Sequence, residues 1–252
     1  MELASFFIIL VTHKQVHKNI IMSKASNHRT SICIAIFLIA GSGKVSAQIN
    51  NIYGSGNEVL RVSKYAEVVG SPYLYPDLRN GIIQDRTGKE TAGIQLRYDT
   101  YSDLIEISMA GATMVADPSM TIKFTILPKA SDSRRIFRNG FVDIIGGTQL
   151  TYYEILLDTG SVKFLKKTKT IMSEEGAGYG GPGKLTRFSS IEKYYLIVGN
   201  NVPVGVKLNR KSFVKESNLD ARKMEDYLNR SENRLKTESD FINLLKFCAA
   251  ET

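Results

Sequence analysis

Short runs of alternating apolar and polar residues, broken by Gly, Asn, Asp and Pro, occupy residues 59–208 of this chain. Alternation of this kind predicts antiparallel strands that bury one side of a sheet and leave the other side in water. In residues 121–126 the side chains of Ile122, Phe124 and Ile126 fall on one side, because successive side chains of a strand point in opposite directions.

The last strands are expected on either side of Gly199-Asn200-Asn201. Residues 194–198 and 204–208 are apolar and flank these three turn residues, which predicts a closing hairpin. Residues 161–164 alternate as well. The sequence therefore predicts a mainly β (α+β) fold across residues 48–208, built as an antiparallel meander sheet or a half-barrel.

Two parts of this region match at an offset of 59 residues. Arg-Asn-Gly-Ile-Ile at 79–83 aligns with Arg-Asn-Gly-Phe-Val at 138–142, and Asp99-Thr100 aligns with Asp158-Thr159. Two interpretations fit. One is a duplication, with the sheet built from two similar three-strand units; the other is repeated use of the same turn residues, since Gly, Asn and Asp dominate turns.

Residues 172–190 are interpreted as a long Gly-rich loop, which in a compact domain is either functional or disordered. The loop satisfies Gly-x-Gly-x-x-Gly at residues 176–181 and Gly-x-x-x-x-Gly-Lys at 178–184. The second pattern requires Ser or Thr next, and this chain has Leu185. Neither pattern follows a buried strand or opens a helix, so we expect no nucleotide cofactor.

Residues 209–252 change to a helical period. One helical turn is expected at 213–216, and residues 219–230 place their apolar side chains along one side. A second amphipathic segment follows Thr237, with Asp240 three residues later as in a capping box. We predict a C-terminal pair of short helices packed on the sheet.

The N-terminus has the three parts of a secretory signal peptide at residues 22–47. A basic start precedes an apolar run at 32–40 and a small-residue cleavage site that ends at Ala47. Residues 1–21 precede the more natural start at Met22 and are interpreted as a misannotated extension. We expect a secreted or periplasmic mature protein.

Removal of this segment would restrict the available chemistry. Cleavage after Ala47 removes residues 1–47, which hold all three histidines, one of the two cysteines, five of the 33 Lys and Arg residues and one of the 25 Asp and Glu residues, so the net charge falls from +8 to +4. A zinc site and Ser–His catalysis then lack their ligands and base. Cys248 continues an apolar helical stripe and is expected to be buried. We predict no metal, no nucleic-acid partner and no membrane span, because neither apolar run approaches ~20 residues.

The sharpest chemical motif is Leu-Leu-Asp-Thr-Gly-Ser at residues 156–161. It resembles the active-site motif of the retropepsin-like aspartic proteases, and Leu-Ile-Val-Gly at 196–199 is similar to that family's later element. The resemblance implies a dimer in which Asp158, with Thr159 and Gly160, is the catalytic group, because two such aspartates share a proton and activate a water.

A hairpin turn is the competing interpretation of the same residues. Asp-Thr-Gly between alternating strands is good turn chemistry. Four lysines follow the motif, and a cationic cluster favours an ionised aspartate over a shared proton; these are Lys163, Lys166, Lys167 and Lys169. We favour the turn, and therefore no catalytic residue.

Tyrosine is frequent in the predicted strands and offers a third interpretation, a glycan or peptide binder with a concave tyrosine surface. Packing within the sheet is the alternative. The tyrosines in question are Tyr73, Tyr75, Tyr98, Tyr152, Tyr153, Tyr194 and Tyr195.

Several segments spread along the chain resemble a group of uncharacterised exported β-rich proteins of Bacteroidetes. They are residues 70–75 (Gly-Ser-Pro-Tyr-Leu-Tyr), 96–99, 193–196, 211–213 and 240–245. The resemblance implies an envelope or extracellular location and no known activity. We expect a non-enzymatic binding or envelope-structural protein with an unknown extracellular or envelope ligand; the oligomeric state stays open.

Overall fold

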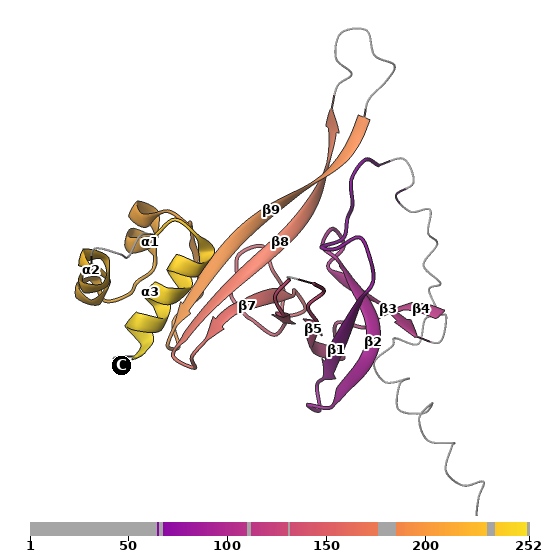
Figure 1. The fold of residues 1–252 in the computed structure, drawn as a ribbon, viewed down its shortest axis with the longest axis horizontal. Coiled ribbons are helices and arrows are strands. Elements are labelled where there is room, and N and C mark those ends of the chain that lie inside the picture. Colours follow the sequence, from indigo (N-terminus) through magenta and orange to yellow (C-terminus); the bar gives the residue numbers. More distant parts are fainter. Residues whose placement is uncertain are drawn as a thin grey trace, which may run out of the picture. The chain divides into compact units, whose positions relative to one another are not determined.

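One antiparallel sheet followed by helices forms the described part of the protein (Figure 1). These residues belong to one compact unit within Val45–Thr252. The predicted signal segment and the extension before it lie outside the described residues. The computed structural model describes residues 65, 68–109, 112–130, 132–175, 185–230 and 235–250.

Ten strands and three helices are present within those ranges. They are β1 (Arg79–Asp85), β2 (Glu90–Asp99), β3 (Leu104–Met109), β4 (Ala112–Val115), β5 (Thr121–Ile126), β6 (Arg135–Arg138), β7 (Tyr153–Asp158), β8 (Val162–Glu175), β9 (Leu185–Val198), β10 (Val204–Val206), α1 (Arg210–Glu216), α2 (Ala221–Asn229) and α3 (Glu238–Ala250).

The sheet is open and has the order β10-β9-β8-β7-β6-β5-β1-β2-β3-β4. β1 to β4 form a meander, β5 returns to pair with the free edge of β1, and β6 to β10 continue as a second meander from β5. The predicted mainly β, antiparallel architecture is confirmed. Its one departure from a simple meander is the connection from β4 to β5.

The alternation in the sequence marks real strands. In β5, Phe124 and Ile126 are buried and Ile122 is half-buried, and the predicted closing hairpin is β9 paired with β10. The predicted loop at 172–190 was wrong in extent, because β8 runs to Glu175 and β9 starts at Leu185. The glycine motifs at 176–184 lie outside the described residues.

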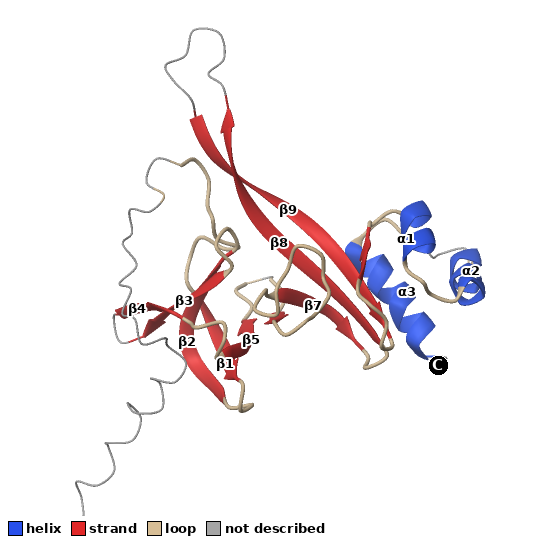
Figure 2. Ribbon diagram, turned by 180° about the vertical axis from the view of Figure 1, so that it is seen from behind, coloured by secondary structure: helices blue, strands red, loops and turns tan. Residues whose placement is uncertain are grey.

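β8 and β9 form a long two-stranded ribbon, which we call the β8–β9 ribbon. Its ladder runs without interruption from Val162 opposite Val198 to Glu175 opposite Leu185. β7 pairs only with residues 163–166 of β8, so the ribbon extends past β7 on the side away from the helices (Figure 2). We call residues 162–166 with 194–198 the proximal half, and residues 167–175 with 185–193 the distal half.

Two hydrophobic cores lie on the same side of the sheet. Phe137 is opposite Glu154, and Glu154 is opposite Lys166, so these side chains share a side, and Phe164 shares it too because strand side chains alternate. Phe137 belongs to the core over β1, β2, β3 and β5, whereas Phe164 belongs to the core under the helices. A third, smaller cluster, containing Leu165, lies on the other side.

The helices are capped as their sequences suggest. Asp220 accepts hydrogen bonds from the amides of residues 222 and 223 at the start of α2. The carboxylate of Asp240 accepts from the Thr237 amide at 2.8 Å, and the Asp240 amide donates to Thr237 Oγ1 at 3.3 Å, so the predicted capping box is confirmed. The predicted helix pair is α2 and α3; the expected turn at 213–216 is part of a third helix, α1.

The proposed repeat matches only in part. At the offset of 59, β2 corresponds to β7 and β3 to the start of β8, but residues 79–83 begin β1 whereas residues 138–142 leave β6. The shared residues therefore mark equivalent turns after β2 and β7, and the first strands of the two units do not correspond.

Candidate functional site

Three turns and one helix end meet at the proximal end of the β8–β9 ribbon. They are the β7–β8 turn at 158–161, the β9–β10 turn at 199–203, the α1–α2 connection at 217–220, and the end of α3 near Cys248. The amide of Gly199 donates to the carbonyl of Ser161 at 2.7 Å. The two segments that resemble retropepsin elements therefore lie side by side, as adjacent turns.

Asp158 is a turn residue in this arrangement. Its Oδ1 accepts a hydrogen bond from the amide of Gly160 at 3.0 Å, and Gly160 has φ +84°, a conformation that favours glycine. Its side chain is 31% exposed, and Arg138 Nη1 lies 3.9 Å from Oδ2. The charged partner of Asp158 in this geometry is a cation, whereas retropepsin chemistry needs a second aspartate that shares a proton. The geometry favours the turn interpretation.

The equivalent turn after β2 also has an aspartate carboxylate that accepts hydrogen bonds from backbone amides, and this aspartate, Asp99, is buried. Asp99 Oδ1 accepts from the amides of Tyr101 and Ser102 at 2.9 and 3.0 Å, and Tyr65 donates its hydroxyl proton to Oδ2 at 3.2 Å. A turn role thus explains both aspartates of the offset match.

The four lysines after Asp158 do not converge on it. Lys163 Nζ donates to the carbonyl of Gly160 at 3.0 Å, which keeps it at the turn. Lys166 and Lys167 point to opposite sides of β8, and Lys169 is exposed in the distal half. The predicted electrostatic cluster around Asp158 was therefore wrong for three of its four members.

A cavity of about 440 Å³ opens at this end of the sheet, and we call it the turn-end pocket. Its volume lies in the range typical of small-molecule sites. Apolar residues form part of its wall, Val162, Val198, Leu219 and Cys248, and the remaining lining residues are Ser161, Gly199, Asn200, Asn201, Asn218, Asp220 and Lys223.

Local backbone geometry builds the polar part of this pocket. Gly199 has φ +59° and Asn218 has φ +53°, and asparagine is among the few residues that tolerate this region. Asp220 is already committed as the N-cap of α2. Side-chain amides carry both donors and acceptors without charge, so the three asparagines can hydrogen-bond uncharged polar groups, beside one lysine, Lys223, in the same lining.

A second cavity of about 300 Å³ lies on the other side of the same β9–β10 turn. It shares residues 199–201 with the turn-end pocket, but it is lined by Lys163 and Ile197, whose side chains alternate with those of Val162 and Val198. Arg138 and Asp143 also line it. The β9–β10 turn thus separates two pockets that each have acidic and basic lining residues, Asp220 and Lys223 in the turn-end pocket and Asp143, Arg138 and Lys163 in the other.

A buried ion network joins the sheet to α3, and sequence reasoning missed it. Arg135 binds Glu154 through two hydrogen bonds of 2.7 and 2.5 Å, and Lys166 Nζ lies 3.5 Å from Glu154 and 2.8 Å from Glu238. Burial alone lowers the pKa of Lys166, but Glu238, Glu154 and Glu192 outweigh it and raise that pKa. The network lies between the two cores of the same sheet face and holds α3 against β8.

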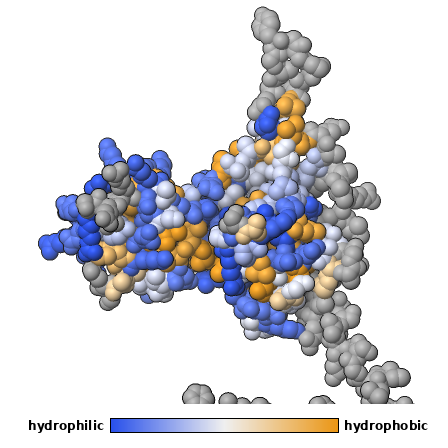
Figure 3. All heavy atoms as spheres, in the orientation of Figure 1, coloured by the Kyte–Doolittle hydropathy of each residue, from blue (hydrophilic) through white to orange (hydrophobic). Residues whose placement is uncertain are grey.

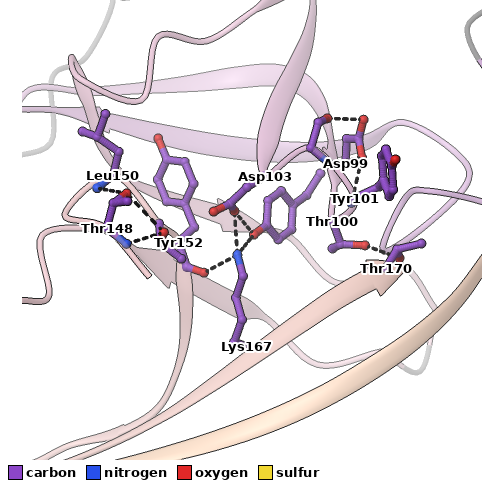
Figure 4. A network of polar contacts seen from close by, with 12 residues as sticks. Asp99, Thr100, Tyr101, Asp103, Thr148, Leu150, Tyr152, Lys167 and Thr170 are labelled. Carbon is purple, nitrogen blue, oxygen red and sulfur yellow. Dashed lines mark hydrogen bonds and ion pairs between the residues drawn. The ribbon is translucent and has the colours of Figure 1, made fainter. Parts of the chain in front are cut away.

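A second buried network fixes the start of the distal half (Figure 4). Lys167 Nζ donates to Asp103 Oδ1 at 2.7 Å, to the Tyr98 hydroxyl at 2.9 Å and to the Tyr152 carbonyl at 3.1 Å. Burial lowers the pKa of Lys167, and a shifted pKa can mark a catalytic group. Here the three ammonium protons have three acceptors, so the arrangement ties β8 to β2, to the β2–β3 turn and to Tyr152, the residue before β7.

The tyrosines form no concave binding surface. Tyr98, Tyr152, Tyr153 and Tyr195 are buried, and the first three contact other rings of the cores edge-on or tilted. The half-buried Tyr73 and Tyr75 each lie under a guanidinium, that of Arg97 at 3.8 Å and that of Arg79 at 3.7 Å. Tyr194, the seventh, packs on the core under the helices, so the seven tyrosines are divided among separate clusters. The tyrosine-surface interpretation was wrong; the packing alternative is confirmed for the buried four.

Within the described ranges, His, Cys, Asp and Glu nowhere form a group of three or more able to hold a metal ion. Nor does any helix in that part of the chain have the length and apolarity to cross a membrane. No family model, curated protein or solved structure matches this chain significantly.

Proposed function

We propose that the protein is an exported, non-enzymatic binding protein that holds a small uncharged polar ligand in the turn-end pocket. The observation that carries the proposal is the pocket itself, about 440 Å³ with an apolar wall and a rim of three asparagines. An apolar wall with a few polar groups is the usual construction of a small-molecule site. Sugars fit this description, since they combine hydroxyl groups with apolar C–H faces.

Export is proposed from the signal-like residues 22–47, and the resemblance to exported Bacteroidetes proteins supports the same location. N-terminal sequencing of protein recovered from the periplasm or medium tests it. Export with cleavage predicts a first residue Gln48, and a retained Met1 or Met22 in that fraction would contradict it.

The ligand is tested by isothermal titration calorimetry against a panel of neutral mono- and disaccharides. We expect at least one member to bind, and we expect Asn200→Ala with Asn201→Ala to weaken that binding about tenfold or more, since each lost hydrogen bond contributes about 1 kcal/mol. Asn243→Ala, on the exposed side of α3, is the matched control and should bind as the wild type does.

Two results would overturn the proposal. One is a panel without a binder, and the other is binding that the double alanine variant leaves intact. Peptide cleavage at acidic pH that is abolished by Asp158→Asn would instead favour the retropepsin alternative.

A further inference from the structure

Beyond Lys167, the distal half of the β8–β9 ribbon has one side that packs on the protein near the β2–β3 turn and one that does not. Thr168, Thr170 and Phe188 are buried on the packed side. Thr170 Oγ1 lies 2.7 Å from Thr100 Oγ1, and the ring of Phe188 contacts that of Tyr101 edge-on at 5.5 Å. This side therefore rests on the β2–β3 turn.

The opposite side is exposed at residues 169–173 and 185–193, and we call this part the outer ribbon face. Lys167, at the start of the same side, is held in the buried network with Asp103. The register places Lys169 opposite Ile191, and Lys193 opposite Lys167, so the remaining members follow from alternation. The face is defined by six exposed residues: Lys169, Ile171, Leu185, Arg187, Ile191 and Lys193. Ser173 and Ser189 lie between them.

Cations and aliphatic side chains share this face. Ile171, Ile191 and Leu185 are 37%, 38% and 42% exposed, and three Lys or Arg residues flank them. Glu174 and Glu192 are exposed too, but alternation places them on the opposite side of the ribbon. In Figure 3 the ribbon end below the grey atoms at the top shows hydrophobic and hydrophilic atoms side by side.

We propose that the outer ribbon face docks the protein on an anionic phospholipid surface. Lys and Arg near such a surface are attracted by its negative potential, while adjacent aliphatic groups enter the boundary between headgroups and acyl chains. A two-stranded ribbon presents both kinds of group toward one plane. The inference goes beyond ligand binding in the turn-end pocket and does not depend on it.

A nucleic acid fits this face less well. Single-stranded nucleic acid is held by cations together with aromatic rings on which bases stack, and the six defining residues include no aromatic side chain. Three exposed aliphatic side chains would also gain nothing from a phosphate backbone. Their presence is what favours lipid over a purely anionic polymer.

The first test is flotation of the purified protein with phosphatidylglycerol vesicles and with phosphatidylcholine vesicles. We expect binding to the former, weakened by salt because the attraction is electrostatic. Lys169→Glu with Lys193→Glu should lower binding about tenfold or more. The matched control, Lys211→Glu with Lys246→Glu, makes the same charge change at exposed helix positions and should bind as the wild type does.

The second test uses the absence of tryptophan from this chain. Ile191→Trp places a single indole on the outer ribbon face, and Ile145→Trp places one at a loop residue that is 92% exposed. Phosphatidylglycerol vesicles should shift the emission of the first to shorter wavelength and leave the second unchanged. Circular dichroism of each variant checks that the fold is kept.

Three outcomes would overturn the proposal. The two charge-reversed variants bind vesicles equally; the two tryptophan variants respond alike; or single-stranded DNA binds the wild type more tightly than the vesicles do. The last result would assign the face to an anionic polymer.

Discussion

The two halves of the β8–β9 ribbon share one continuous ladder of backbone hydrogen bonds and differ in what covers them. In the proximal half, Phe164 faces the helices and Leu165 faces the third cluster, so both sides are buried. In the distal half beyond Lys167, one side contacts the β2–β3 turn and the other is exposed. The backbone hydrogen bonding is therefore the same along the whole ribbon. The side chains alone determine which half belongs to the core.

Removal of a large proximal side chain should have the largest effect. Phe164 is fully buried between the sheet and the helices, in contact with Phe213. Phe164→Ala should lower the free energy of unfolding by about 3–5 kcal/mol, from lost burial and the cavity left behind. The distal counterpart Ile171→Ala should lower it by about 1 kcal/mol or less. Urea denaturation measures both, and similar losses would remove the distinction between the halves.

Replacing a lysine should also destabilise the protein more in the proximal half than in the distal half. The loss in unfolding free energy should be smaller than for Phe164→Ala. Lys166→Met removes the cation that Glu154 and Glu238 share. Removing one partner of a buried ion pair lowers the free energy of unfolding by about 3 kcal/mol. Lys169→Met, at an exposed distal position, should change it by less than about 0.5 kcal/mol. Denaturation midpoints give the comparison. Equal midpoints for the two variants would show that the Lys166 network contributes nothing to folding.

The sequence predicted the parts of this comparison that depend on local pattern. Ile122, Phe124 and Ile126 alternate strictly, and they form β5; Asp158-Thr159-Gly160 is a hairpin turn because the Asp carboxylate bonds its own backbone two residues on. Both outcomes rest on contacts within a few residues. No knowledge of the partner strands was required.

The distal half was missed because apolar residues are interspersed with polar ones on both of its sides, so that neither side has a regular apolar stripe. Thr168 and Thr170 are buried, and Thr170 contacts a turn 70 residues earlier in the chain. The outer face has a composition that is also typical of loops. The glycines after Glu175 strengthened that impression. Register, which decides that Lys166 and Lys167 enter different networks, is a property of long-range pairing and cannot be derived from one strand.

The turn-end pocket is formed by residues that lie even farther apart in the sequence. Its wall combines Val162 of β8 with Cys248 of α3. The sequence indicated that Cys248 is buried, which the structure confirms. It held no signal that this helix end lies beside the β9–β10 turn, because that placement follows from tertiary packing of the helices on the sheet.

Lys167 lies at the boundary between the proximal and distal halves. Its effect on the free energy of unfolding should be the smallest of those described, and it should appear as a dependence on pH. Burial lowers the pKa of Lys167 from the usual 10.5. Between the lowered pKa and 10.5 the unfolded chain binds more protons at this group than the folded one, so its contribution to stability rises with pH. The slope is at most about 1.4 kcal/mol per pH unit.

Lys167→Met removes this slope, so the difference in unfolding free energy between wild type and variant should rise as pH increases within that window. The comparison belongs below pH 10, because burial raises the pKa of Tyr98 and Tyr152 in the folded state, which lowers stability at higher pH in both proteins. Lys169→Met, exposed two residues further along the ribbon, should keep the wild-type slope. Parallel profiles for wild type and Lys167→Met would contradict this prediction. They would mean that Lys167 stays charged in both the folded and the unfolded state, paired with Asp103 in the folded one.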